Sequence, residues 1–169
     1  MNKIEDLIKL EDILINKPAK IYVTFESLDK ANVVIEGNCS DVLVASFDLI
    51  VALIEKDTNV DSSIFISTIL DRGNKFRILQ KKRLAKNEVD FNISDCYLHF
   101  DVDENSYIKF DSCTSTYTSI FGIVSMLDCL VEKYNLDYDS YVEFFTYSYR
   151  KWLSGEKRKE FLSGKYDKK

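Results

Sequence analysis

A strand–turn–strand pattern that occurs twice constrains the fold of this chain more than any other feature. The first copy spans residues 21–37 and the second spans residues 96–112. In each copy, apolar and polar residues alternate with the period of two that is typical of a strand with one buried face. Each copy therefore predicts a β-hairpin. Aligned without a gap, the copies match Tyr22 to Tyr97, Phe25 to Phe100, Glu26 to Asp101, Val33 to Ile108, and Glu36 to Asp111.

Two helices are expected after each hairpin. A nearly continuous apolar stretch begins at Asp41 after the first hairpin, and a second begins near Ile120. Such stretches are typical of helices that are buried on most of their surface. The motif LIEK in the first helix recurs as LVEK in the second. We therefore expect an α+β fold in which a ββαα unit is duplicated, over residues 19–72 and 94–153. The two units would form a four-stranded antiparallel sheet with helices on one face.

The whole chain, residues 1–169, is expected to fold as a single domain. An amphipathic helix is expected over residues 2–16, followed by Pro18, which disfavours further helix. A basic connecting helix is expected over residues 74–88, between the two units. The C-terminal residues 154–169 are expected to be a frayed basic tail.

The composition is that of an ordinary soluble globular protein, with 46% hydrophobic and 30% charged residues. No apolar run approaches the roughly 20 residues that a membrane span requires. Acidic residues interrupt the N-terminal apolar positions, which argues against a signal peptide. The four cysteines include no CxxC pair, so we expect reduced, mostly buried thiols in a cytoplasmic protein without a metal site.

Charge is unevenly distributed along the chain. Residues 75–86 contain six basic side chains and no acid, and residues 150–169 contain eight bases and three acids. Because the whole chain has a net charge of −5, the remainder is strongly acidic. Such a distribution affects the choice of partner rather than the fold.

One face of the predicted sheet is aromatic and acidic. If Ile21, Val23 and Phe25 point toward the helices, their neighbours in the strands point away from them. Exposed tyrosines provide large contact areas at a small entropic cost, and carboxylates suit a basic partner. The same residues would also stabilise a solvated sheet face without any partner. The candidate partner-binding residues are Tyr22, Glu26, Glu36, Tyr97, His99, Asp101, Tyr107 and Asp111.

No catalytic, cofactor or metal motif is present. His99 could act with a carboxylate as a general base, but no nucleophile lies in a recognisable motif near it. Asp101, Asp103 and Asn105 match the first positions of a calcium loop. The later glycine and glutamate of that loop are missing, so a hairpin turn is the better interpretation.

A basic patch offers a second interpretation. Six side chains could contact a phosphate backbone, although a charged helix face is the commoner explanation. Phe76, Leu79 and Leu84 are expected on one side of that helix. The patch consists of Lys75, Arg77, Lys81, Lys82, Arg83 and Lys86.

The last predicted helix carries more aromatic residues than one buried stripe requires. Six of its side chains between Tyr141 and Trp152 are aromatic. Some of them are therefore expected at the surface or in an interface, which suggests a homo-oligomer formed through this helix.

These observations favour a non-enzymatic protein that binds another protein. We expect it to inhibit or modulate a basic, nucleic-acid-handling partner, as immunity proteins and phage anti-defence proteins do, by presenting carboxylates where the partner expects phosphates. One alternative is a nucleic-acid-associated regulatory protein that uses residues 75–86 and the basic tail. Another is an enzyme or small-ligand protein with a pocket between the two units, near His99.

Overall fold

The structure is a computed structural model that describes residues 18–56, 62–86, 93–105, 107–155 and 166–168. The expected N-terminal helix at residues 2–16 lies outside the described residues, as does most of the basic tail. No described helix is both long enough and apolar enough to cross a membrane.

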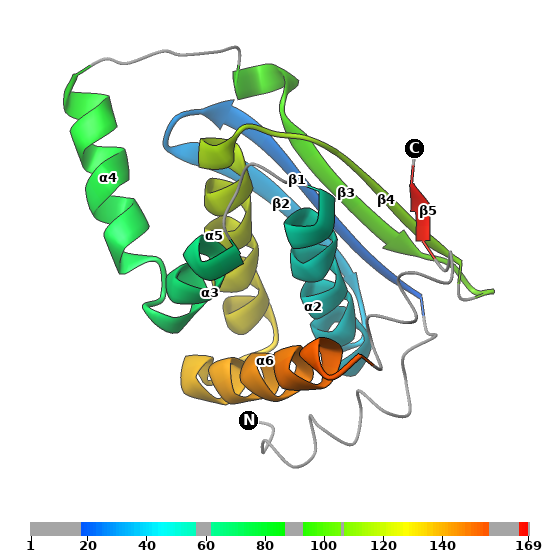
Figure 1. Cartoon of the computed structure of the whole chain (residues 1–169). Helices are drawn as coiled ribbons and strands as arrows, with labels where there is room; N and C mark the ends of the chain where they lie inside the picture. Colours follow the sequence, from blue (N-terminus) through cyan, green and yellow to red (C-terminus); the bar gives the residue numbers. More distant parts are fainter. Residues whose placement is uncertain (1–17, 57–61, 87–92, 106, 156–165, 169) are drawn as a thin grey trace.

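The described strands form one sheet in the order β2-β1-β3-β4-β5 (Figure 1). The first four strands pair antiparallel, which confirms the predicted four-stranded antiparallel sheet. The fifth strand pairs in parallel with β4, in a segment for which we expected a frayed tail. The strands are β1 (Ala19–Ser27), β2 (Lys30–Gly37), β3 (Tyr97–Val102), β4 (Ile108–Cys113) and β5 (Tyr166–Lys168).

The long helices α2 and α5 pack against one face of the sheet, as predicted (Figure 1). The helix α6 lies across them on the side away from the sheet, and α4 lies at one end of the molecule. A short 3-10 helix, η1 (Ile93–Asp95), leads into β3. The α-helices are α2 (Cys39–Lys56), α3 (Ser62–Leu70), α4 (Asn74–Ala85), α5 (Thr116–Lys133) and α6 (Tyr138–Leu153).

The core lies between the sheet and α2 and α5. Alternate residues of the strands point into it, including Ile21, Val23 and Phe25 as expected, and all of these are buried. Gly122 lets α5 approach the sheet closely. A Cβ atom there would lie 2.6 Å from Cδ1 of Leu98. The inward-facing residues are Ile21, Val23, Phe25, Cys96, Leu98 and Phe100.

Most aromatic residues of α6 are inside the protein, but Tyr147 and Tyr149 are only half-buried, so the expectation that some of them reach the surface holds in part. Tyr141, Phe144, Phe145 and Trp152 are each at most 3% exposed. They find room because α6 packs on the outside of the long helices, with Phe145 contacting Phe47 of α2. The homo-oligomer expected through α6 stays a prediction.

The central pairing of the sheet agrees with a pseudo-twofold axis. Val23 of β1 lies directly opposite Leu98 of β3, and these are equivalent positions of the gapless alignment. On either side of this pair, Tyr22 lies opposite His99 and Thr24 lies opposite Tyr97. The ββαα order also occurs twice. The duplication itself stays a prediction.

The return strands do not follow the gapless alignment. Asp111 lies opposite His99, whose counterpart in the first hairpin is Thr24. The partner of Thr24 is Asn32 rather than Glu36. The connection between β3 and β4 is the longer one, and it shifts the second return strand relative to the first. Glu36 and Asp111 are therefore not structurally equivalent.

A lysine at the end of each long helix bonds to the return strand of the other hairpin. Lys133, the last residue of α5, donates to the backbone carbonyl of Ile35 in β2 at 2.5 Å. Lys56, the last residue of α2, donates to the carbonyl of Ser112 in β4 at 2.8 Å. The LIEK and LVEK motifs thus end in lysines with the same structural role.

The connecting helix α4 is amphipathic in a different way from the one predicted. Phe76 is 6% exposed and packs on Tyr117 and Phe121 of α5. Leu79 and Leu84, which we expected beside it, are 46% and 38% exposed. By helical geometry both leucines lie within about 60–80° of Phe76, so their exposure shows that only a narrow strip of α4 around Phe76 packs on α5.

The four cysteines, all within the described part of the chain, form no disulfide. Cys96 is buried, whereas Cys113 is exposed, so the expectation of mostly buried thiols holds only in part.

Candidate partner-binding face of the sheet

The side of the sheet that faces away from α2 and α5 is called the outer face below. Thr24, Val34 and Tyr107 are exposed on it. The outer face is formed by Lys20, Tyr22, Thr24 and Glu26 of β1, Lys30, Asn32, Val34 and Glu36 of β2, Tyr97, His99 and Asp101 of β3, and Tyr107, Lys109 and Asp111 on β4 and beside it.

Three rings form an aromatic row across the centre of the outer face. Tyr22 stacks on His99, with ring centroids 4.3 Å apart and an interplanar angle of 23°. His99 also contacts Tyr97, with centroids 4.8 Å apart. The row arises because Tyr22 and His99 are opposite one another in the β1–β3 ladder, while Tyr97 and His99 are two residues apart on one strand. The predicted residues Tyr22, Tyr97 and His99 are thus brought together, whereas Tyr107 is not part of the row.

One end of the row is fixed by a hydrogen bond. The hydroxyl of Tyr97 donates to Oδ2 of Asp111 at 3.2 Å. Ionisation of Tyr97 would remove this donor and place a second negative charge beside the carboxylate. The pKa of Tyr97 is therefore raised above its ordinary value.

The outer face carries basic side chains that the predicted set did not include. Lys20 pairs with Glu36 at 3.6 Å and lies 5.1 Å from the ring centroid of Tyr22. Lys30 pairs with Glu26 at 3.1 Å. Hydrogen bonds from Asn32 and Lys30 lower the pKa of Glu26.

Asp101 lies opposite Lys20 in β1 and opposite Lys109 in β4. The four carboxylates of the face are therefore accompanied by three lysines. The middle of the outer face is consequently less acidic than the predicted residues alone would make it.

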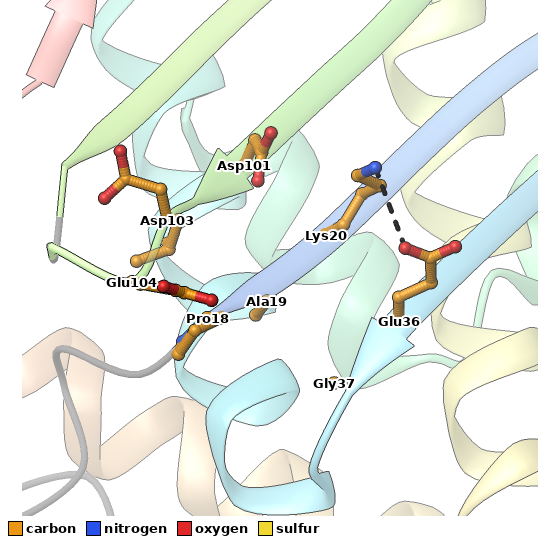
Figure 2. A pocket seen from close by; sticks show the side chains of 9 residues that line it. Pro18, Ala19, Lys20, Glu36, Gly37, Asp101, Asp103 and Glu104 are labelled. Atoms are coloured by element: carbon orange, nitrogen blue, oxygen red, sulfur yellow. Dashed lines mark ion pairs between the residues drawn. The ribbon is translucent and has the colours of Figure 1, made fainter.

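Acidity is concentrated at one end of the face, where the residues form a depression of about 280 Å³ (Figure 2). Four carboxylates and a single ammonium group line it, and it is called the acidic depression below. Figure 2 shows the Lys20–Glu36 ion pair on one side, with Asp101, Asp103 and Glu104 on the other. Its lining comprises Pro18, Ala19, Lys20, Glu36, Gly37, Asp101, Val102, Asp103 and Glu104.

Asp103 stabilises the connection between β3 and β4. Its Oδ1 accepts hydrogen bonds from the backbone N–H groups of Asn105 at 2.9 Å and Tyr107 at 3.0 Å. This confirms the interpretation of the Asp101–Asn105 segment as a hairpin turn rather than a calcium loop. Within the described ranges, no group of three His, Cys, Asp or Glu residues could hold a metal ion.

The predicted site residues divide between two parts of the face. Glu36 and Asp101 line the acidic depression. Glu26 lies at the opposite end of β1, six residues from Lys20, or about 20 Å along an extended strand. Lys20, Asp103 and Glu104 were missed as site residues, although they lie beside predicted positions or in the acidic turn sequence. Their contribution depends on strand pairing, which the sequence pattern left open.

The predicted basic patch on α4 is also divided. Arg77 faces the body of the protein and pairs with Asp128 of α5 at 2.7 Å. The guanidinium of Arg83 lies 4.9 Å from the ring centroid of Tyr117. The four lysines of the patch remain exposed: Lys75, Lys81, Lys82 and Lys86.

His99 belongs to the aromatic row and does not line the acidic depression. Two further depressions are also lined by other residues. One of about 260 Å³ lies at Lys56 and Cys113, and one of about 480 Å³ lies between Arg72 and Tyr138. The proposal of a ligand pocket at His99 stays a prediction.

Comparison of the chain with protein-family models, with curated proteins and with solved structures finds no match. The function is therefore argued from the geometry of the outer face alone.

Proposed function

We propose that this protein is a non-enzymatic binding protein whose outer sheet face engages the basic surface of a partner protein. The observation that supports the proposal is the placement of two features on one sheet face. The aromatic row of Tyr22, His99 and Tyr97 lies at its centre, and the acidic depression lies at its end. Aromatic side chains dominate the energy of many protein interfaces, and complementary charge sets their orientation and association rate.

The row is prepared for binding because its rings are already ordered. The stack on His99 restricts the ring of Tyr22, and Asp111 holds the hydroxyl of Tyr97. Less side-chain entropy is then lost when a partner packs on these rings. The acidic depression would accept an arginine or lysine side chain of the partner, because its carboxylates outnumber its one ammonium group.

A partner that handles nucleic acid fits this chemistry best. Such a protein presents basic side chains where phosphates bind, and the carboxylates of the depression would occupy these positions. The consequence for the partner would be inhibition or modulation, which is the mode of action of immunity proteins and phage anti-defence proteins.

The acidic depression can be tested by titrating the protein with a hexa-arginine peptide and recording NMR spectra. We expect salt-sensitive shifts of the amides of Lys20, Glu36, Asp101 and Glu104. Reversing two charges of the depression, Glu36→Lys with Asp101→Lys, should weaken binding at least about tenfold. The matched control, Glu132→Lys with Glu143→Lys, makes the same change of net charge on α5 and α6. Equal weakening by both pairs would show that only net charge matters and would refute the site.

The proposed mode of action is tested by competition. A protein retained from a host lysate by the wild-type chain should be lost with Tyr22→Ala and with the reversed depression, but not with the control pair. If that protein binds nucleic acid, its oligonucleotide should displace the present chain from it. Simultaneous binding of both would contradict the proposal that carboxylates replace phosphates.

A further inference from the structure

We propose that β2 is the dimerisation strand of this protein and pairs antiparallel with β2 of a second copy. The strand lies at the edge of the sheet, and among the described residues only β1 pairs with it. An edge strand presents unpaired N–H and C=O groups that readily pair with another strand. The proposal rests on the free edge of β2 and shares only the Lys20–Glu36 ion pair with the function proposed for the outer face.

Two side-chain hydrogen bonds show which residues of β2 direct their backbone groups toward the open edge. The carbonyl of Ile35 accepts from Lys133, and the carbonyl of Gly37 accepts from Tyr134 at 2.7 Å. Both residues therefore direct their backbone groups away from β1. In an antiparallel ladder this orientation alternates along the strand, so Ala31 and Val33 direct theirs outward as well.

The capped end limits where a second strand can bind. Tyr134 caps the carbonyl of Gly37 and Lys133 occupies one lone pair of the Ile35 carbonyl, so among the described residues Ala31 and Val33 are the outward-facing positions without a cap. On the other edge of the antiparallel sheet, β4 has the same arrangement. Lys56 caps Ser112, and β5 pairs with Ile108–Phe110, between the turn and that carbonyl. The segment between the turn and the capped carbonyl is thus paired with β5 in β4, whereas no described strand pairs with the corresponding edge of β2.

The sequence of β2, KANVVIEG, is complementary to itself in one antiparallel register. If Val33 lies on the twofold axis, Lys30 faces Glu36 of the second copy. Ala31 then faces its Ile35, and Asn32 faces its Val34. The carbonyl of Ile35 has a second lone pair for the new ladder bond. Lys30 and Glu36 have side chains that are 66% and 64% exposed, so both are accessible for this pairing.

Charge complementarity selects a second copy rather than an unrelated strand. Within one chain Glu26 pairs with Lys30, and Lys20 pairs with Glu36. The proposed register places Lys30 of one copy beside Glu36 of the other, so the two ion pairs join into one row of alternating charge. The twofold axis produces two such rows in each dimer. The two sheets would become one continuous sheet with both outer faces on the same side.

The first test is sedimentation velocity between about 1 μM and 1 mM protein. We expect a reversible monomer–dimer equilibrium. Val33→Pro should give a monomer, because it removes an outward N–H while leaving the bonds to β1 intact. Val33→Thr is the matched control, since it keeps the amide and the branched shape, and it should still dimerise. A wild-type monomer throughout this range, or a folded Val33→Pro dimer, would overturn the proposal.

The register is tested by exchanging charges. Lys30→Glu and Glu36→Lys should each weaken the dimer about tenfold, because each places like charges opposite one another twice. The double variant again places opposite charges across the interface, so it should dimerise more tightly than either single variant, although it loses the ion pairs within each chain. Failure of the double variant to do so would reject this register.

A measurement on the wild-type protein covers the case in which a proline variant does not fold. Hydrogen exchange at the amides of Ala31 and Val33 should slow as the protein concentration rises, while that of solvent-exposed amides of α4 stays constant. Exchange at Ala31 and Val33 that does not depend on concentration in a dimeric sample would place the interface elsewhere.

Discussion

The hydroxyl oxygens of Tyr141 and Ser46 lie 2.7 Å apart in the buried interior, where α6 crosses α2. Ser46 donates its single hydroxyl proton to the carbonyl of Leu43 at 2.7 Å. Tyr141 is therefore the donor to Ser46. The two side chains are both 0% exposed, so water cannot replace either partner.

This relationship predicts unequal costs for removing its two ends. Ser46→Ala should lower the free energy of unfolding by about 1–3 kcal/mol, because it leaves the Tyr141 hydroxyl buried without an acceptor. Tyr141→Phe should cost only about 1 kcal/mol, since Ser46 keeps its bond to Leu43. Adding Tyr141→Phe to Ser46→Ala should recover part of the loss in urea denaturation. A double variant less stable than the sum of the two single changes would contradict this assignment of donor and acceptor.

Stability should fall in strongly alkaline solution because buried tyrosines resist ionisation. Burial raises the pKa of Tyr138 to about 12, and its hydroxyl donates to the carbonyl of Ile69 at 2.8 Å. Below pH 10 the residue is neutral in both states. Between about pH 10 and 12 only the unfolded state loses the proton, which costs about 1.4 kcal/mol per pH unit.

The change that tests this is Tyr138→Phe, followed by denaturation at several pH values. Its free energy of unfolding should decline less steeply above pH 10 than that of the wild type. Some decline should remain, because burial also raises the pKa of Tyr141. The matched control is Tyr107→Phe, which removes the same hydroxyl group from a side chain that is 49% exposed.

Gly122→Ala should destabilise the protein although alanine favours helix. A Cβ atom would lie 2.6 Å from Cδ1 of Leu98 and 3.3 Å from the ring of Phe25. Because Leu98 is 0% exposed, it has little room to move, and overpacking should cost about 1–3 kcal/mol. Leu98→Val should relieve the clash, so the double variant should be more stable than Gly122→Ala alone. A gain in stability from Gly122→Ala by itself would show that helix propensity dominates here.

Binding of nucleic acid to α4 should be weak. Arg77 is paired with Asp128, and Arg83 lies on Tyr117, so neither is readily available for phosphates. We expect no salt-sensitive change in fluorescence polarisation of a labelled DNA or RNA oligonucleotide. A change that disappears both at high salt and in Lys81→Glu with Lys82→Glu would instead support the nucleic-acid alternative.

Much of the fold was predictable because local patterns of apolar and polar residues indicate its strands and long helices. The period-two alternation located both hairpins and assigned Ile21, Leu98 and their neighbours to the core. The apolar stretches located α2 and α5. The pattern failed at α4, where Leu79 and Leu84 are exposed although both are apolar. Short helices with few buried contacts leave such positions undetermined.

The candidate site was predictable only in part. Residues that share a strand face, such as Tyr97 and His99, could be grouped from their spacing alone. Residues on different strands could be grouped only if the register was known, and the gapless alignment gave the wrong register for Asp111. In α6, spacing alone could not show which aromatic residues are buried, because that depends on how α6 packs across α2.

Hydrophobic period and apolarity act locally, so local patterns are enough to locate the strands, the long helices and the buried side of each hairpin. Which charged side chains become neighbours depends instead on how the strands pair. Lys20 meets Glu36 through the hairpin register, and Asp101 joins them through the pairing of β1 with β3. The acidic depression exists only when β1, β2 and β3 lie side by side. Its residues come from segments more than 60 positions apart, and no local pattern connects them.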